Sequence, residues 1–347
     1  MQTRGNELEG LEGQRFCIVG GAGFIGSHFT DALLGEPGVR QVTLYDNFSS
    51  GRAWHYAHHE GDARLRVIRG EVEKLDQLRE AIDGHDVVIH LASNPDIARA
   101  ATEPSVDFWQ GTALTHNVVE AMRTSSAKRI LYASGSGVYG DLGEREATED
   151  HGPLVPVSTY GASKLAGEAL ISSYSYMFDL SACVFRFANV VGPRQTHGVG
   201  FDFARRLLAA RAERPTGRVT LRILGDGTQS KSYIHASDVV RAVLTAHVST
   251  QPGAKGAVPF QAYNVGTGDY ITVTEIAHLA LECVGLDAAD VEFQYTSGNR
   301  GWKGDVPIVR FSSERIRATG WRCKHSTREA LRQSILAMLP DLRSGRM

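Results

Sequence analysis

The chain has 347 residues, 42% of them hydrophobic and 22% charged, and its 37 Lys and Arg against 39 Asp and Glu leave a formal net charge of −2. This composition excludes disorder as the main state, and the lack of a basic excess argues against a nucleic-acid partner. Cys17, Cys183, Cys283 and Cys323 form no CxxC or Cys/His cluster. We therefore expect reduced structural thiols, no metal site and a cytoplasmic location.

The N-terminal tail, residues 1–14, is polar and lacks the apolar segment of a signal peptide. No apolar run is long enough for a membrane span, so we expect no membrane partner.

Short β-branched runs alternate with longer amphipathic stretches from residue 15 onward. We expect strands at 15–20, 41–46, 65–69, 86–91, 128–134 and 180–187, and helices at 24–35, 74–82, 105–124 and 158–177. This alternation predicts an α/β fold, a Rossmann-type doubly wound parallel sheet spanning residues 15–188.

The pattern changes after Asn189, where short strands at 222–224 and 262–265 are separated by helices at 200–212, 237–247, 273–284 and 327–338. We interpret residues 189–340 as a smaller C-terminal α/β lobe that binds substrate, with part of the chain crossing back to the sheet. The ligand cleft is expected where the lobes meet, beyond the carboxyl ends of the strands.

A glycine-rich loop follows the first expected strand and opens the first helix. Gly20 allows a tight turn, Gly23 lets the backbone approach a pyrophosphate, and Gly26 allows close packing of helix on sheet, with Phe24 and Ile25 beginning the helix. Such a run alone also fits an ordinary structural turn. The context favours a dinucleotide site.

An acidic residue, Asp46, ends the second expected strand, 20 residues after Gly26. A carboxylate there accepts hydrogen bonds from the ribose 2′-hydroxyl and repels a 2′-phosphate, which favours NAD over NADP. The adenosine end would then meet the residues that follow, Asn47, Ser49, Gly51 and Arg52.

A second signal pairs a phenol with an ammonium, because Tyr160 and Lys164 are spaced i and i+4 on one helix face. A nearby cation favours the phenolate and lowers the pKa of a tyrosine, which makes it a general acid or base for an alcohol. The same spacing also occurs by chance on solvated helices. Its position after a dinucleotide fingerprint favours catalysis.

Several motifs together carry a family resemblance that extends over residues 15–338. They are GGAGFIG at 20–26, HLAS at 90–93, SGSGVYG at 134–140, YGASK at 160–164, THGVGFDF at 196–203, RFANVVGPR at 186–194, ILGDGTQSKSYIHASDV at 223–239 and RGWKGDVP at 300–307. With them the chain resembles the extended short-chain dehydrogenase/reductase family. Within that family it is most similar to the nucleotide-sugar 4-epimerases of UDP-glucose and UDP-glucuronate.

The resemblance implies roles for residues on the cofactor side. Tyr160 would take the proton of the sugar O4 while the C4 hydride passes to a tightly bound NAD, and Lys164 would hold the nicotinamide ribose and tune Tyr160. Glu71 and Val72 would contact the adenosine, and Leu91, Ala92 and Ser93 would line the pyrophosphate and ribose.

On the substrate side, the resemblance assigns the UDP diphosphate to Asn189, Lys231 and Arg300, and the pocket to His197, Gln229 and Tyr233. It also implies a homodimer that pairs through the helices expected at 105–124 and 158–177.

Three residues depart from the family pattern. Gly135 stands where relatives carry the catalytic Ser or Thr. Either Ser136, which we favour, or Ser134 must then donate a hydrogen bond to the sugar O4, or Tyr160 acts without such a bond. Gly111 replaces an Asn that contacts the cofactor, and Lys231 replaces an Arg.

Other activities of this family need residues that the chain lacks. A 4,6-dehydratase needs an Asp-Glu pair before VYG and a uronate decarboxylase needs a Glu there, whereas this chain has Ser136 and Gly137. A non-catalytic NAD-binding protein remains an alternative, disfavoured by the intact Tyr160 and Lys164. The space at Gly135–Gly137 and the nearby cation Arg194 favour interconversion of UDP-glucuronate and UDP-galacturonate. UDP-glucose remains open as substrate.

Overall fold

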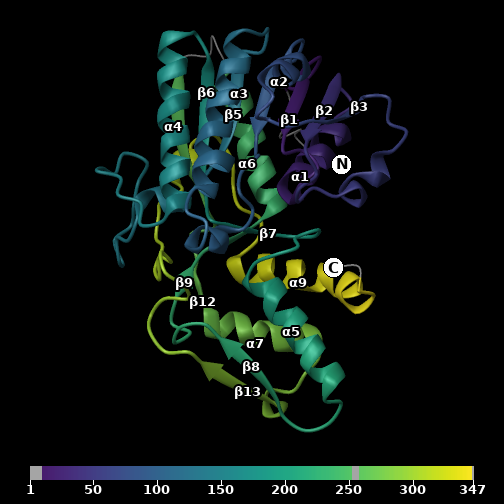
Figure 1. Cartoon of the computed structure of the whole chain (residues 1–347), viewed down its shortest axis with the longest axis vertical. Coiled ribbons are helices and arrows are strands. Elements are labelled where there is room, and N and C mark those ends of the chain that lie inside the picture. The colour runs from purple at the N-terminus through teal and green to yellow at the C-terminus, as the bar shows by residue number, and fades with distance from the viewer. Residues whose placement is uncertain (1–9, 252–257, 346–347) are drawn as a thin grey trace, which may run out of the picture.

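The computed structural model describes residues 10–251 and 258–345, and it contains a seven-stranded sheet at its centre (Figure 1). Residues 1–9 of the expected tail lie outside the described part. The strand order is β11-β6-β5-β4-β1-β2-β3, and every neighbouring pair is parallel. The strands are β1 Arg15–Val19, β2 Gln41–Asp46, β3 Leu65–Arg69, β4 Val87–His90, β5 Arg129–Gly135, β6 Ser181–Phe187 and β11 Phe260–Val265. The expected Rossmann-type fold is confirmed.

Helices cover both faces of this sheet, and its central strands are therefore buried on both sides. One layer contains α2 Leu75–Ile82, α3 Leu114–Arg123 and α4 Thr159–Met177, and the other contains α1 Phe24–Gly35 and α6 Ala236–Ser249. The stretch expected as one helix at 105–124 begins as a π-helix, η4 Phe108–Ala113, and continues as α3. Short helical turns are η1 Ala53–His55, η2 Ala57–His59, η3 Ile97–Ala101 and η5 Ser136–Tyr139.

The second lobe has its own apolar core (Figure 1). Its helices are α5 Val199–Glu213, α7 Val273–Val284 and α9 Thr327–Arg343, and they pack beside parallel strands β8 Val219–Ile223 and β13 Val291–Tyr295. Shorter elements are β7 Asn189–Val191 paired with β10 Tyr233–His235, β9 Ser230–Lys231 paired with β12 Ile271–Thr272, η6 Ala288–Asp290 and α8 Glu314–Arg317.

The chain passes between the lobes more than once. After β7 and β10 it returns to the large sheet, where α6 packs against α1 and β11 pairs with β6 at the edge. The strand order reverses between β1 and β4, and a ligand crevice is expected beyond the carboxyl ends of strands at such a point. Among the described residues, no helix is both long and apolar enough to cross a membrane.

Candidate active site

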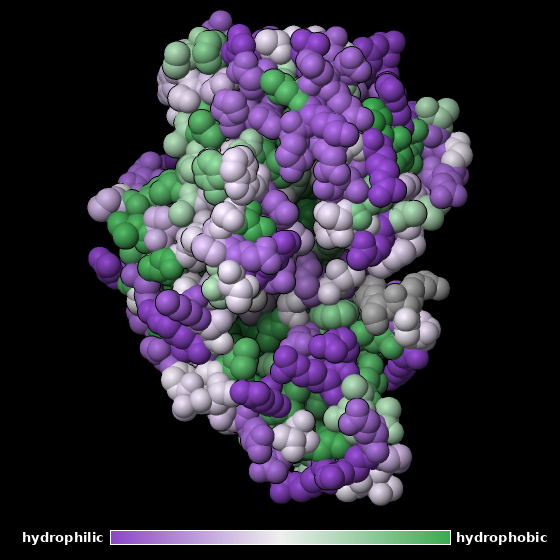
Figure 2. Space-filling model, in the orientation of Figure 1, coloured by the Kyte–Doolittle hydropathy of each residue, from purple (hydrophilic) through white to green (hydrophobic). Residues whose placement is uncertain are grey.

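A cavity of about 930 Å³ lies at the reversal point and is lined by residues from both lobes. The space-filling view shows a recess with hydrophobic residues at its floor between the lobes (Figure 2). Most of the expected site residues line it: Gly20, Gly23, Phe24, Ile25, Gly26, Asp46, Asn47, Ser49, Val72, Leu91, Ala92, Ser93, Ser134, Ser136, Tyr160, Lys164, Asn189, His197, Lys231 and Tyr233. The fold thus brings the two expected halves of the site together.

The glycine loop between β1 and α1 has no room for a side chain at Gly20 or Gly26. Gly20 has φ +83°, and a Cβ there would lie 2.7 Å from the backbone nitrogen of Ala92. A Cβ at Gly26 would lie 2.5 Å from the carbonyl oxygen of Gly21. No side chain caps the N-terminus of α1 and its first turn holds no acidic residue, so the backbone is open to an anion. The loop therefore fits the pyrophosphate of a dinucleotide.

The carboxylate of Asp46 is anchored by the same loop. It accepts hydrogen bonds from the backbone N–H of Ala22 at 2.9 Å and of Phe48 at 2.7 Å. Burial raises its pKa, and these two bonds counteract the rise. Because two carboxylate oxygens offer about four acceptor positions, Asp46 retains capacity for ribose hydroxyls.

Three expected adenosine contacts lie behind the cavity wall. Glu71 accepts a hydrogen bond from Asn47 Nδ2 at 2.9 Å, and so positions a lining residue. Gly51 packs against the Asp46 carboxylate, which a Cβ would approach to 2.9 Å, and the backbone N–H of Arg52 donates to the carbonyl of Ala22. These three residues support the loop and the lining residue Asn47, and their direct contact with the cofactor stays a prediction.

Helix α4 presents the phenol and the ammonium. Ser158 caps α4 by accepting from the N–H of Gly161, which places Tyr160 in the first turn. The Lys164 ammonium lies 5.5 Å from the centroid of the Tyr160 ring and donates to the carbonyl of Ala133 at 2.8 Å. Burial lowers the pKa of Lys164 to about 8, although Glu168 and Asp107 counteract it.

The expected lowering of the phenol pKa is not found in the cofactor-free chain. Burial and the Asp107 carboxylate raise the pKa of Tyr160 to about 12, while the Ser93 hydroxyl lowers it by less. Asp107 is itself buried between Asn94, which donates at 2.8 Å, and Thr159, which donates at 2.7 Å. Tyr160 therefore holds its proton at neutral pH.

The two candidate serines on the β5 side differ in their surroundings. Ser134 is buried and donates to Glu168 Oε1 at 2.5 Å, so its hydroxyl is committed to that carboxylate. Ser136 is half-buried and lines the cavity. A Cβ built at Gly135 would meet nothing within 4 Å. Ser136 is thus the better candidate for O4, and space exists for the family hydroxyl that Gly135 lacks.

Three expected substrate ligands, Arg194, Arg300 and Gln229, bond to other groups of the chain. Arg194 pairs with Asp31 at 2.5 Å and donates to the carbonyl of His55. Arg300 pairs with Asp141 at 2.6 Å. Gln229 is buried and donates to the carbonyl of Leu224, so none of the three lines the cavity.

The remaining expected ligands line the cavity, and each has its own surroundings. Lys231 lines the cavity and pairs with the buried Asp305 at 2.5 Å, which positions its ammonium. Asn189 is exposed to the cavity and donates to the carbonyl of Ser232. Burial lowers the pKa of His197, which favours the neutral imidazole. Together these groups give the second-lobe side of the cavity one cation and several neutral polar groups.

Sequence reasoning missed several residues of this cavity wall: Asn94, Gln110, Thr196, Trp302, Val306 and Val309. Asn94 directly follows HLAS, and Gln110 lies in the π-helix, an irregularity often found at functional sites. Gly111 in the same turn has no room for a side chain, because a Cβ there would lie 2.6 Å from Ser163 Oγ. Trp302, from the RGWKGDVP motif, also lines the cavity.

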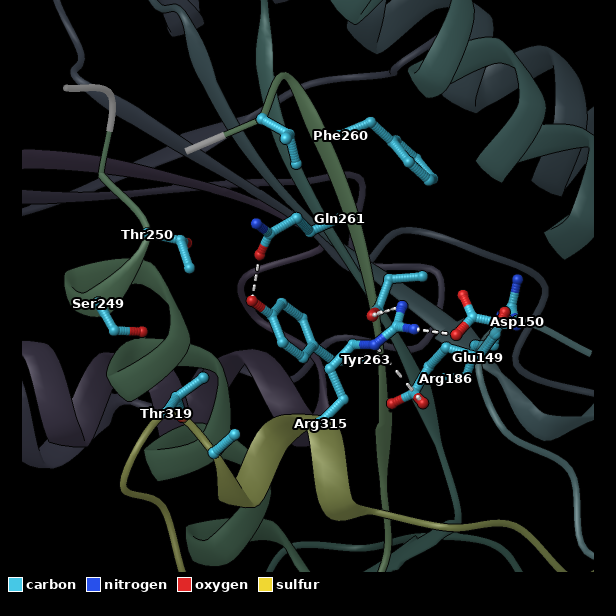
Figure 3. Close-up of a pocket in the computed structure, with 13 residues that line it drawn as sticks. Glu149, Asp150, Arg186, Ser249, Thr250, Phe260, Gln261, Tyr263, Arg315 and Thr319 are labelled. Atoms are coloured by element: carbon cyan, nitrogen blue, oxygen red, sulfur yellow. Dashed lines mark hydrogen bonds and ion pairs between the residues drawn. The ribbon is translucent and has the colours of Figure 1, made fainter. Parts of the chain in front are cut away.

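A second cavity of about 660 Å³ lies along the edge strand β11 (Figure 3). Arg315 and Glu149 bond to the backbone of this edge, at the carbonyl of Ala262 and the N–H of Asn264. Side chains thus occupy hydrogen-bonding groups that an uncovered edge would expose. This cavity contains neither the glycine loop nor Tyr160, and we assign the active site to the larger cavity.

Comparison with known proteins agrees with this assignment. Residues 16–266 match the model of the NAD dependent epimerase/dehydratase family. A UDP-glucose 4-epimerase of Mycolicibacterium smegmatis is 30% identical, covering 92% of this chain and 97% of the relative. The structure of a UDP-glucose 4-epimerase from Thermotoga maritima with UDP-glucose is 28% identical with a TM-score of 0.80, covering 94% of this chain and 99% of that one.

A dTDP-glucose 4,6-dehydratase of Actinoplanes is also similar, at 27% identity over 80% of this chain and 84% of the relative. The chain is thus similar to relatives of both activities. The chain belongs to the NAD dependent epimerase/dehydratase family, and NAD is its cofactor.

Proposed function

We propose that this protein is a 4-epimerase of a UDP-hexose that uses bound NAD. The observation that carries the proposal is that Tyr160 and Lys164 line the same cavity as the glycine loop and Lys231 of the second lobe. NAD supplies hydride acceptance from C4 and hydride return to the opposite face of the sugar. Tyr160 would receive the O4 proton and give it back, and the charge of Lys164 favours the phenolate at that moment.

The residues before VYG support epimerisation over dehydration. A dehydratase must protonate a leaving hydroxyl and remove a C5 proton, which requires an acid and a base at this place. Ser136 and Gly137 supply neither. Because the sequence lacks this pair, we favour the activity of the 4-epimerase relatives over that of the dehydratase relative.

We propose UDP-glucose and UDP-galactose as the first substrate pair. The expectation of UDP-glucuronate depended on two features, the space at Gly135–Gly137 and the cation Arg194. The space is present, but Arg194 is paired with Asp31 away from the cavity. UDP-glucuronate therefore remains the second candidate, supported by the open space beside Gly135.

The test is an NMR assay of purified protein with UDP-glucose and, separately, UDP-glucuronate, without added NAD. We expect the galacto epimer from UDP-glucose, and turnover with no added cofactor because redox balances within each cycle. Epimerisation of the uronate alone would replace the substrate and keep the mechanism. If no 4-epimer forms from either sugar, even with NAD supplied, the proposal is wrong.

Ser136 provides a prediction specific to this chain. Replacing Ser136 by Ala is expected to lower kcat by roughly tenfold to a hundredfold, about 1.4 to 2.7 kcal/mol of transition-state stabilisation, because a hydroxyl directed at O4 is lost. Adding Gly135→Thr to that variant is expected to restore part of the rate, because a side chain fits there. Steady-state kinetics of the single and double variants check both; an unchanged S136A rate removes Ser136 from the mechanism.

We also propose a homodimer that forms through the α3–α4 layer. Exposed apolar side chains lie at both ends of this pair: Phe108 and Trp109 are 52% and 61% exposed, and Tyr176 and Met177 are 65% and 70% exposed. Trp109→Asp is expected to convert a dimer into a monomer in light scattering, whereas Leu336→Asp on α9 leaves the mass unchanged. A wild-type monomer would contradict this prediction.

A further inference from the structure

A carboxylate and two imidazoles meet outside the active site, between α1 and the η2 turn. Asp31 Oδ1 lies 2.7 Å from His58 Nε2 and 2.9 Å from His59 Nε2. One ligand atom from each of the three residues lies within 4.8 Å of the other two. The family reaction described above uses none of these side chains.

The donor set and its surroundings suit a metal ion of the zinc type. Zn²⁺ prefers imidazole nitrogen and carboxylate oxygen, and three protein ligands with water in a fourth position are a common arrangement. The His58 side chain is 51% exposed, which leaves a route from solvent, whereas His59 is 19% exposed and Asp31 is 35% exposed. Two ligands come from one turn and the third from a helix, so an ion would bridge them.

The other carboxylate oxygen of Asp31 is already oriented. Arg194 donates to Oδ2 at 2.5 Å, and Arg194 also donates to the carbonyl of His55. Outer hydrogen bonds of this kind fix the direction of a ligating carboxylate. Asp31 thus presents Oδ1 to the two imidazoles while Oδ2 is held by Arg194.

We propose that Asp31, His58 and His59 form a binding site for one divalent transition-metal ion, with Zn²⁺ as the expected occupant. The Nε2 atoms, now directed at Asp31 Oδ1, would bind the ion as neutral imidazole nitrogens, so that each exchanges its N–H hydrogen bond for a metal bond. The carboxylate supplies Oδ1 and retains Arg194 on Oδ2. This site replaces our expectation that the chain has no metal site.

The proposed metal site lies close in sequence to His55, which contacts the glycine loop. His55, three residues before His58, lines the active-site cavity and contacts the carbonyl of Ala22 in the glycine loop at 2.7 Å. An ion that joins η2 to α1 would hold the segment at the adenosine end of that cavity in place. Bound metal should therefore slow the release of NAD.

The test uses the full chain without a polyhistidine tag, dialysed against a chelator. Titration with Co²⁺, a spectroscopic substitute for Zn²⁺, should give visible d–d absorption that saturates at one ion per chain and disappears when Zn²⁺ is added. His58→Gln and His59→Gln should each weaken binding by at least about tenfold, the loss that follows even from removing an outer partner of a metal ligand. Gln keeps an N–H donor for Asp31, which protects the fold.

The control is His278→Gln, which changes an exposed histidine on α7 far along the chain from this cluster. It should bind Co²⁺ as the unmodified protein does. The absence of a saturable site, or equal affinity in H58Q, H59Q and H278Q, would overturn the proposal and leave the cluster as a hydrogen-bonded structural contact. Thermal unfolding of each apo variant shows whether a loss of binding reflects a loss of fold.

Discussion

Replacing Tyr160 by Phe is expected to lower kcat for 4-epimerisation by about 10³-fold, within the range typical of general acid–base catalysis. The change removes one hydroxyl and keeps the ring that lies 5.5 Å from the Lys164 ammonium. Because the glycine loop and Asp46 are untouched, bound NAD and the unfolding midpoint should stay as in the unmodified protein. Stopped-flow and steady-state kinetics with UDP-glucose provide the measurement.

The control for this result is Tyr132→Phe. Tyr132 is a buried tyrosine whose ring lies 5.1 Å from the same ammonium, but it belongs to the apolar core rather than the cavity wall. Its loss should leave kcat within a few fold of the unmodified value. A Tyr160→Phe enzyme that keeps more than about a tenth of the activity would show that another group moves the O4 proton, since one missing acid or base usually costs far more.

The second large effect is on stability and concerns the buried ion pair of Arg186 and Glu168. Their side chains are 6% and 5% exposed, with Arg186 Nη2 2.7 Å from Glu168 Oε2. Arg186 also donates to the Tyr139 hydroxyl at 2.9 Å. Arg186→Met should lower the free energy of unfolding by about 3–5 kcal/mol, because it leaves a buried carboxylate without its cation.

An exposed ion pair provides the control. Arg328 pairs with Glu282 at 2.9 Å, and these side chains are 51% and 57% exposed. Arg328→Met should therefore cost less than about 1 kcal/mol, as exposed ion pairs do. Glu168→Gln added to Arg186→Met should recover part of the loss. Urea unfolding measures all four proteins, and equal losses for Arg186→Met and Arg328→Met would contradict this explanation.

The parallel sheet and the cofactor loop were predictable from sequence because their signals are local. Buried β-branched runs indicated six strands of the main sheet, and the spacing of Gly20, Gly23 and Gly26 reflects a backbone that excludes side chains. The pairing of β11 with β6 in that sheet was harder to predict from sequence. Strands pair through backbone hydrogen bonds, so the residues of a strand do not indicate which strand lies beside it.

Substrate-side residues were harder to predict because their roles depend on which partner the fold provides. Arg194 and Lys231 are both cations in motif segments, yet Arg194 meets Asp31 of α1 while Lys231 remains at the cavity wall beside Asp305. The pKa of Tyr160 shows the same limit. The i, i+4 spacing correctly predicted a nearby ammonium. The direction in which the pKa of Tyr160 shifts, however, is determined by burial and by Asp107, which is far from Tyr160 in sequence.

Epimerisation of UDP-glucose in D₂O, followed by NMR and mass spectrometry, distinguishes 4-epimerisation from dehydration. In the proposed reaction only the hydroxyl proton exchanges with solvent, because the C4 hydride passes to NAD and returns. We therefore predict UDP-galactose with no deuterium on carbon. Deuterium at C5, or a product that has lost water, would show proton removal from carbon and would contradict the assignment of this chain as a 4-epimerase.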